Sequence, residues 1–334
     1  MAIRIAINGF GRIGRNVLRA AWDSPDIEFV HINDLTSDDM LAYLLSHDSV
    51  HGTWKSVQAV EGGLQIGDKL IPTSAVRNPA DLPWAERQVD IVLECTGVFT
   101  NGDKARAHID AGAKKVIISA PGTNVDGTFV VGVNDDELTG DETIVSNASC
   151  TTNCLAPLAK VLHETVGIEH GTMTTVHAYT MDQNLLDAPH NKGKFRRARA
   201  AAVNMVPTST GAATAISLVY PALAGKLDGM AIRVPTPDGS LVDLVFTASR
   251  DTTAEELNAA ITAAANGPLK GILGLADAHT VSSDIVGNPH SSIVDLPLTK
   301  VSGGRLVKVL TWYDNEWGFS NRMIDLARIL AAKS

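Results

Sequence analysis

The N-terminal half of the chain alternates short apolar runs with stretches of helical periodicity. The pattern predicts a strand at Ile3 to Asn8, a helix at Gly11 to Trp22 and a second strand at Phe29 to Asn33. Further strand-like runs follow at 89–97, 114–121 and 142–147. These runs are continuously apolar rather than alternating, which is typical of parallel strands covered on both faces. The pattern therefore predicts an α/β domain with a Rossmann-type, doubly wound parallel sheet.

Beyond about residue 150 the strand-like segments become longer and more mixed in polarity. They lie at 172–180, 229–237, 240–249 and 304–314. Mixed polarity is typical of a largely antiparallel sheet with at least one open face. Helices are predicted at about Gly211 to Tyr220, Ala254 to Ala265 and Glu316 to Ala332. We therefore expect a second domain of α+β type with a mostly antiparallel sheet.

Composition narrows the class of protein. The 334 residues are 45% hydrophobic and 19% charged, which is ample for two cored domains. No apolar run approaches a membrane span, and the first residues lack the features of a signal peptide. Three cysteines favour a reducing compartment, and a net charge of −9 argues against general affinity for nucleic acid or anionic membrane. We expect a cytoplasmic protein with no membrane association and no dedicated nucleic-acid binding.

A glycine motif connects the first predicted strand to the first predicted helix. Gly9, Gly11 and Gly14 form G-x-G-x-x-G, and Asp34 follows at the end of the second strand. In this context the first glycine allows a tight turn, the second lets the backbone approach a pyrophosphate, and the third lets helix and strand pack closely. Asp34 would accept hydrogen bonds from the adenine ribose and repel a 2′-phosphate. The motif therefore predicts NAD rather than NADP as cofactor.

A second motif, SNASCTTNC at 146–154, places Cys150 at the first turn of a predicted helix that ends near Gly167. A helix N-terminus lowers a thiol pKa and favours the thiolate. Spacing alone leaves open whether Cys150 is a reactive thiol or a packed core residue. Cys154 and Cys95 are expected to be buried, and no metal site is expected because no histidines stand at ligand spacing. His177, within a strand-like segment, is either a general base or a hydrogen-bonded residue of the sheet.

Several motifs together resemble one family over essentially the whole chain. They are NGFGRIGR, SNASCTTN, TVHAYT, PTSTGAA, RVPTPDGS and WYDNEWG. The chain resembles the phosphorylating glyceraldehyde-3-phosphate dehydrogenases of bacterial type. The resemblance implies an NAD-binding domain at 1–149 and 315–334, a catalytic domain at 150–314, a homotetramer, and a role in glycolysis.

The resemblance also implies the reaction. Cys150 would be the nucleophile and His177 its base, so that a thiolate attacks the aldehyde of D-glyceraldehyde 3-phosphate. The hemithioacetal would lose a hydride to the nicotinamide, and inorganic phosphate would release the resulting thioester as 1,3-bisphosphoglycerate. The Cys150 backbone N–H and the His177 side chain would stabilise the oxyanion.

Binding residues follow from the same resemblance. Thr180 and Arg233 would bind the substrate phosphate, and Arg197 would lie between the two phosphate sites. The residues implied for inorganic phosphate are Ser149, Thr151, Thr210 and Gly211. The further residues implied for NAD are Arg12 and Ile13 at the pyrophosphate turn, Arg77 and Ser119 near its two halves, and Asn315 at the carboxamide. The basic segment 192–199 would be a phosphate-binding or subunit-contact loop, against the alternatives of a solvated loop or a nucleic-acid patch.

Three alternatives remain open. Erythrose-4-phosphate dehydrogenases share the cysteine motif, but Tyr179-Thr180 and the run Ser209 to Gly211 favour glyceraldehyde 3-phosphate. A cysteine hydrolase or acyltransferase without NAD would leave the glycine motif and Asp34 without a role. A non-catalytic NAD- or RNA-binding protein on the same fold is disfavoured because both Cys150 and His177 are present and aromatic residues make up only 5% of the chain.

Ala188-Pro189 departs from the leucine-proline of many NAD-specific relatives, which leaves some NADP use open.

Overall fold

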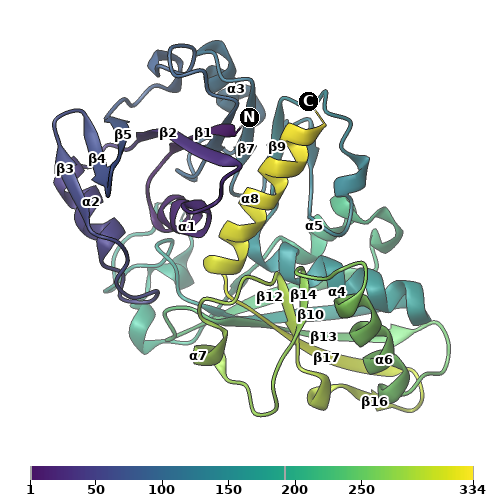
Figure 1. The fold of residues 1–334 in the computed structure, drawn as a ribbon. Helices are drawn as coiled ribbons and strands as arrows, with labels where there is room; N and C mark the ends of the chain where they lie inside the picture. Colours follow the sequence, from purple (N-terminus) through teal and green to yellow (C-terminus); the bar gives the residue numbers. More distant parts are fainter. Residues whose placement is uncertain (1, 192, 334) are drawn as a thin grey trace. The chain divides into compact units, whose positions relative to one another are not determined.

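The protein is described by a computed structural model that covers residues 2–191 and 193–333. Internal contacts divide it into two compact units (Figure 1). The first contains the residues up to Ser149 and those from Phe319 onward, and the second is Cys150–Gly318. Residues 315–318 group with the second unit, whereas the sequence interpretation placed them with the first. The reason is local, because Ser240 donates a 2.6 Å hydrogen bond to the side-chain oxygen of Asn315.

The first unit is built on a mostly parallel sheet with strand order β3-β4-β5-β2-β1-β6-β7-β9-β8. The parallel pairs join the strands predicted from the apolar runs, with a short strand, β8, added at one edge. Their bounds are β1 Ile3–Asn8, β2 Ile27–Asn33, β6 Ile91–Glu94, β7 Lys115–Ile118, β8 Gly127–Thr128 and β9 Ile144–Ser146. The expected doubly wound α/β sheet is therefore confirmed for the strands that carry the glycine motif and its neighbours.

The opposite edge of this sheet departs from the parallel pattern. There β3 (Val57–Val60), β4 (Gly63–Ile66) and β5 (Lys69–Ser74) pair antiparallel, and β5 rejoins β2 in parallel. The connections between these strands are only two residues long, and two-residue loops join antiparallel neighbours. Gly62 and Gly67 adopt positive φ angles of 89° and 60° in these turns. The sequence interpretation did not include these hairpins.

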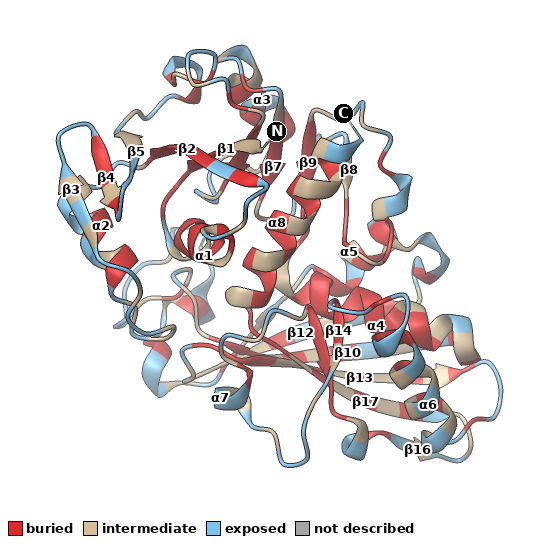
Figure 2. Cartoon of the chain, viewed as in Figure 1, coloured by how far each residue is buried: buried red, intermediate tan, exposed pale blue. Residues whose placement is uncertain are grey.

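Helices cover the first sheet. The α-helices assigned to this unit are α1 Arg12–Ala21, α2 Asp38–Ser46, α3 Gly102–Asp110 and most of α8 Trp317–Ala332; short 3-10 helices lie at Pro79–Asp81 and Asp135–Glu137. The predicted apolar stripe of α8 is buried; it consists of Phe319, Met323, Leu326 and Leu330. Figure 2 shows part of α8 in red, the colour of buried residues. An ion pair between Arg328 and Asp26 ties α8 to the segment before β2.

The second unit is built on a mixed, largely antiparallel sheet with strand order β11-β12-β10-β13-β17-β15-β14, and with β16 on β17. The mostly antiparallel character is confirmed; the exceptions are the parallel pairs β10–β12 and β14–β15. The bounds are β10 Ile168–Ala178, β11 Val206–Ser209, β12 Leu227–Val234, β13 Ser240–Ala248, β14 Leu273–Leu275, β15 Ser292–Val294, β16 Lys300–Ser302 and β17 Leu306–Tyr313. The β10–β12 register places His177 directly opposite Arg233.

The long helix α4 (Cys150–Val166) packs against this sheet and against α5 (Ala212–Val219) and α6 (Ala254–Asn266). It begins at Cys150, as predicted, and ends before Gly167, whose φ of +71° is a conformation that suits glycine. The remaining helices of the unit are α7 Ser282–Ile285 and 3-10 turns at Phe195–Ala198, Ala201–Val203, Pro221–Leu223 and Leu296–Leu298. None of the helices in the described part of the chain is long and apolar enough to cross a membrane.

Candidate functional site

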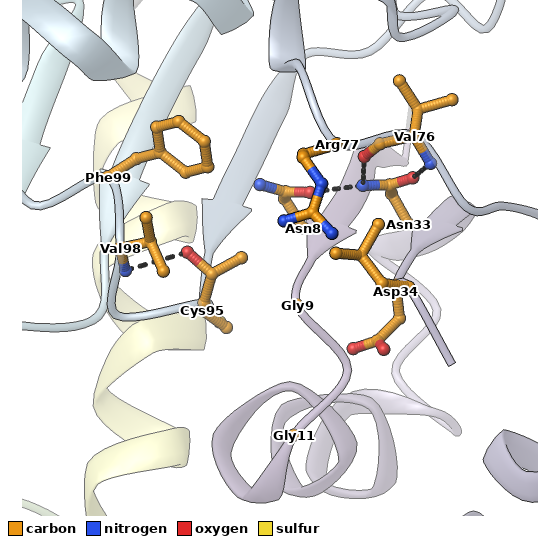
Figure 3. Close-up of a pocket in the computed structure, with 12 residues that line it drawn as sticks. Asn8, Gly9, Gly11, Asn33, Asp34, Val76, Arg77, Cys95, Val98 and Phe99 are labelled. Atoms are coloured by element: carbon orange, nitrogen blue, oxygen red, sulfur yellow. Dashed lines mark hydrogen bonds between the residues drawn. The ribbon is translucent and has the colours of Figure 1, made fainter. Parts of the chain in front are cut away.

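A pocket of about 330 Å³ opens at the carboxyl ends of β1, β2 and β6 in the first unit (Figure 3). Ligands of open α/β sheets bind at this edge of the strands. Four of the residues implied for NAD line the pocket: Gly9, Gly11, Asp34 and Arg77. The other lining residues are Asn8, Asn33, Leu35, Val76, Cys95, Thr96, Val98 and Phe99.

The three glycines of the motif differ in how closely the protein packs around them. Gly9 has a φ of +91°, and a Cβ there would lie 2.6 Å from the Thr96 nitrogen. A Cβ on Gly14 would lie 2.4 Å from the Gly9 carbonyl oxygen, so only glycine lets α1 pack this closely on β1. A Cβ on Gly11 would meet no atom within 4 Å. The turn is therefore tightly packed on its protein side and open where a diphosphate would approach.

Asp34 places a carboxylate in the same pocket. Its oxygens accept hydrogen bonds from the backbone nitrogens of Phe10 (2.7 Å) and Thr36 (2.9 Å), which hold the side chain at the end of β2. A carboxylate held in this way can accept further hydrogen bonds from ribose hydroxyls and would repel a 2′-phosphate. Together with the open glycine turn, this donor and acceptor set fits NAD.

The remaining residues implied for the cofactor are more scattered. Arg12, Ile13 and Gly14 form the first turn of α1, where the Arg12 guanidinium pairs with Asp48. Ser119 follows β7, and its backbone nitrogen donates to the Glu94 carbonyl at 3.0 Å. These four lie outside the lining of the described pocket, and Asn315 belongs to the second unit.

Sequence reasoning missed several residues of the pocket. Asn8, Asn33 and Thr96 stand at or just beyond the ends of adjacent parallel strands, and this position was the available signal for them. Cys95 was expected to be buried, but it is half-buried and lines the pocket, so that expectation was wrong. Cys95 lies just beyond the buried strand β6, which ends at Glu94. The expected burial of Cys154 is confirmed.

In the second unit the structure brings Cys150 and His177 together. The Cys150 Sγ lies 3.6 Å from the His177 Nε2, within hydrogen-bond range for sulfur. The His177 Nδ1 lies 2.7 Å from the Ala178 carbonyl oxygen, which can only accept, so Nδ1 carries the proton. Nε2 of the neutral ring is then an acceptor that faces the thiol. This is the arrangement of a nucleophile beside its base.

Burial opposes the charged form of each partner. It raises the pKa of the Cys150 thiol above its ordinary value, and the lowering effect of Arg233 and of hydrogen bonds from Thr151 does not offset it. Burial and then the charge of Arg233 lower the pKa of His177 to about 3. The pKa of Cys150 is therefore raised, whereas a helix N-terminus alone would lower it. Transfer of the proton from Sγ to Nε2 would create two opposite charges in contact, which stabilise one another in a low-dielectric site.

We expect His177→Asn to move the midpoint of Cys150 alkylation by iodoacetamide upward by about one to three pH units, because the thiolate loses its imidazolium partner. The midpoint should then lie above the ordinary thiol value, since burial alone raises the pKa. The measurement is the alkylation rate as a function of pH. His170→Asn, an exposed position on the same strand, is the matched control and should leave the profile unchanged. Identical profiles for wild type and His177→Asn would remove His177 from the role of base.

Arg233 lies beside this pair, one strand away. Its guanidinium donates to the Ala178 carbonyl at 3.0 Å and to the Thr180 Oγ1 at 3.3 Å. The positive charge acts on the pKa values of both Cys150 and His177, which places it close to both side chains. Arg233 and Thr180, the two residues implied for the substrate phosphate, are therefore in contact.

Arg197 is buried and held from three sides. It forms an ion pair with Asp182, and donates to the Thr208 Oγ1 at 3.1 Å and to the Ser209 carbonyl at 3.2 Å. Its charge also lowers the pKa of Arg233, after burial as the larger cause. Two guanidinium groups close enough for one to lower the pKa of the other form a site that favours an anion. Lys192, in the basic segment, lies outside the described residues.

The structure brings only some of the residues implied for inorganic phosphate together. Thr210 and Gly211 stand at the start of α5, where the Thr210 Oγ1 accepts from the Ala212 nitrogen at 3.2 Å. The Thr151 hydroxyl instead lies 2.9 Å from the hydroxyl of Tyr313, which also lies 2.9 Å from the Thr175 hydroxyl. Ser149 is the last residue before α4 and falls in the first unit. Tyr313 was not predicted, since a buried aromatic in a strand usually signals only core.

Comparisons with known proteins agree with this geometry. The family model "Glyceraldehyde 3-phosphate dehydrogenase, NAD binding domain" matches residues 3–102, and the C-terminal domain model of the same family matches residues 149–315. The chain is 58% identical over 330 residues to glyceraldehyde-3-phosphate dehydrogenase of Cereibacter sphaeroides, covering 98% of each chain. It is 59% identical over 333 residues to that of Kitasatospora aureofaciens, covering 99% of each. It is 56% identical over 335 residues to glyceraldehyde-3-phosphate dehydrogenase 1 of Bacillus subtilis, covering 100% of this chain and 99% of the relative.

Both halves of the chain thus match one family, and the matches extend over nearly the full length of the relatives. The glycine turn and Asp34 form a pocket that fits NAD, and the second unit holds a cysteine–histidine pair beside two arginines. This chain belongs to the glyceraldehyde-3-phosphate dehydrogenase family.

Proposed function

We propose that this protein oxidises D-glyceraldehyde 3-phosphate to 1,3-bisphosphoglycerate with NAD and inorganic phosphate, as a step of glycolysis. The observation that carries the proposal is the 3.6 Å contact between the Cys150 Sγ and an unprotonated His177 Nε2 beside Arg233. Family membership and full-length relatives support this activity. They do not favour oxidation of erythrose 4-phosphate or a non-catalytic binding role.

The chemistry of the chain's own residues follows from this contact. His177 accepts the thiol proton on Nε2 as the Cys150 sulfur attacks the aldehyde carbon, and it returns that proton to the resulting oxyanion, which becomes the hydroxyl of the hemithioacetal. His177 then removes the hydroxyl proton again while the C–H hydride departs, which leaves a thioester. NAD supplies the hydride acceptor when bound. Phosphate attacks the thioester carbon, the Cys150 thiolate leaves, and the acyl phosphate is released.

The phosphate groups have separate residues in this proposal. Arg233 and Thr180 bind the phosphate of the substrate, because their donors converge beside the Cys150–His177 pair. The attacking phosphate is bound by Ser149, Thr151, Thr210 and Gly211, and Arg197 lies between the two phosphate groups. Thr151 can do so by its hydroxyl only if that group exchanges its contact with Tyr313 for one with the anion.

We also propose a cytoplasmic homotetramer in which the segment 181–205 forms a subunit contact. Free Cys95, Cys150 and Cys154 suit a reducing compartment. The segment exposes large apolar side chains that a monomer would leave in water, and such a patch favours association. They are Met181, Leu185, Leu186, Phe195, Val203 and Met205, with exposed fractions from 74% to 91%.

We expect Phe195→Glu to raise the subunit dissociation constant by about tenfold or more, because it places a charge in an apolar contact. Light scattering after size-exclusion chromatography over a dilution series measures the effect. Leu70→Glu, an exposed apolar side chain in the first unit, is the matched control. A variant that stays tetrameric at every dilution would remove the segment from the interface.

The test of the proposed function is the formation of NADH from glyceraldehyde 3-phosphate, followed with and without inorganic phosphate. Phosphate-dependent NADH formation would support the thioester route. The same assay with NADP tests the role of Asp34, and the assay with erythrose 4-phosphate tests the rival substrate. No NADH from folded protein whose Cys150 can be titrated would contradict the proposal.

A further inference from the structure

Beneath the pocket of the first unit lies a carboxylate that no step of the proposed reaction uses. Glu94, at the end of β6, is only 1% exposed. One of its oxygens accepts from the Asn8 Nδ2 at 2.6 Å and from the His108 Nε2 at 3.0 Å. The other accepts from the Thr96 nitrogen at 2.8 Å and from the Thr96 hydroxyl. Each oxygen therefore meets two donors, an arrangement that only an acceptor-only group can satisfy.

The partners of His108 and Asn8 fix which atoms of these two side chains donate to Glu94. On one side the Trp84 Nε1 donates to the His108 Nδ1 at 2.9 Å, and indole can only donate, so the Nε2 of His108 carries the proton that faces Glu94. On the other side the Asn33 Nδ2 donates to the Asn8 Oδ1 at 2.8 Å, which leaves the Asn8 amide nitrogen to face Glu94. His108 and Asn8 therefore each direct a donor toward the same carboxylate.

The network ends on two separate walls of the pocket. In one direction it passes from Asn8 through Asn33, whose Oδ1 accepts from the Val76 nitrogen at 2.9 Å, as Figure 3 shows. In the other direction it passes through the Thr96 hydroxyl, which accepts from the Val98 nitrogen at 3.0 Å. All five of these residues line the pocket, while Glu94 is not among its lining residues.

We propose that Glu94 is a positioning residue for NAD: it anchors the wall of Asn8, Asn33 and Val76 and the wall of Thr96 and Val98 in the geometry that binds the cofactor. The inference rests on NAD being the cofactor of the proposed function. It is separate from catalysis, because Glu94 acts on NAD only through residues that line the pocket. A purely structural role would change the stability of the fold and leave the affinity of the folded protein for NAD unchanged.

The test compares NAD binding by Glu94→Gln and wild-type protein, measured by titration calorimetry of the full chain without substrate. A glutamine amide must turn its nitrogen toward one of the two donor pairs. Two hydrogen bonds are lost if it faces Asn8 and His108, and at least the bond from the Thr96 nitrogen is lost if it faces Thr96, whose hydroxyl can also accept. We expect the dissociation constant for NAD to rise about tenfold or more, the size expected for loss of one to two hydrogen bonds. Glu61→Gln, the same change at an exposed turn, should bind NAD like wild type.

Thr96→Val is the second variant, because Thr96 is exposed and its replacement is compatible with folding. It removes only the hydroxyl that joins Glu94 to the Val98 nitrogen. We expect Thr96→Val to raise the dissociation constant for NAD by about threefold in the wild-type background. In the Glu94→Gln background the same change should raise it by a smaller factor. Coupling of this kind is expected only for residues that act through one another.

The outcomes separate the inference from the proposed function. If wild type binds NAD and folded Glu94→Gln binds it within twofold of the same constant, the positioning role is overturned. Additive effects of Glu94→Gln and Thr96→Val would overturn the coupling of the two walls. If Glu94→Gln does not fold, Thr96→Val alone decides, and an unchanged constant overturns the proposal. Failure of wild-type protein to bind NAD would instead contradict the proposed function.

Discussion

Replacing Cys150 with serine is expected to lower kcat by about 10⁴-fold or more, equivalent to about 5.5 kcal/mol of lost transition-state stabilisation. Serine keeps the shape of the site, but its hydroxyl is a far weaker acid than a thiol and cannot form the thioester that phosphate attacks. The pocket that fits NAD lies in the first unit, whereas Cys150 begins the second. The dissociation constant for NAD should therefore stay within about twofold of wild type, because the change alters none of the residues that line the pocket.

Steady-state kinetics and an NAD titration on the same preparation check this prediction. Cys154→Ser is the matched control, because Cys154 lies one turn further along α4 and is fully buried. The Cys154 Sγ lies 3.9 Å from the Thr311 Oγ1 and from the Trp312 carbonyl oxygen, whereas the base His177 contacts Cys150. Turnover by Cys150→Ser above about one per cent of wild type would show that the reaction does not pass through a thioester on this residue.

Arg233→Ala is expected to raise the KM for glyceraldehyde 3-phosphate by about 10- to 100-fold, because a charge-assisted hydrogen bond contributes about 1.5–3 kcal/mol. A fall in kcat should accompany it, since the charge of Arg233 lowers the pKa of Cys150 and thereby favours the thiolate. The dissociation constant for NAD should not change. This combined effect differs from that expected of a residue that only binds substrate, which would raise KM alone.

The control for this prediction is Arg250→Ala, which removes an exposed arginine of the same unit that pairs with Glu256. It should leave KM and kcat unchanged. Equal weakening of substrate and NAD binding by Arg233→Ala would move Arg233 out of the substrate-phosphate role. A KM within about twofold of wild type would do the same.

Much of the fold could be predicted because its signals are local. The turn at Gly9 to Gly14 is dictated by backbone conformation and close packing, both of which only glycine allows. The start of α4 at Cys150 and its end before Gly167 follow from helix periodicity and a positive φ. The parallel and antiparallel sheets followed from whether apolar positions run continuously or mix with polar ones.

The rest of the fold and site left no clear local signal in the sequence. The hairpins β3 to β5 are short and alternate weakly, so their pattern does not stand out from loop. The role of Glu94 could not be predicted from the sequence, because the four groups that donate hydrogen bonds to it come from three separate segments. The pKa of Cys150 is raised although the helix N-terminus predicts the opposite, because the degree of burial cannot be read from sequence.

The β10–β12 pairing has a consequence for how activity is acquired during folding. His177 and Arg233 are direct partners across this parallel pair, although 56 positions separate them in the sequence. A slip of one residue would turn one of the two side chains to the opposite face of the sheet while leaving most backbone hydrogen bonds formed. Because closing so long a loop is slow, this register forms late compared with local helices. Recovery of enzymatic turnover on refolding thus reports a single long-range alignment, which helical circular dichroism would not detect.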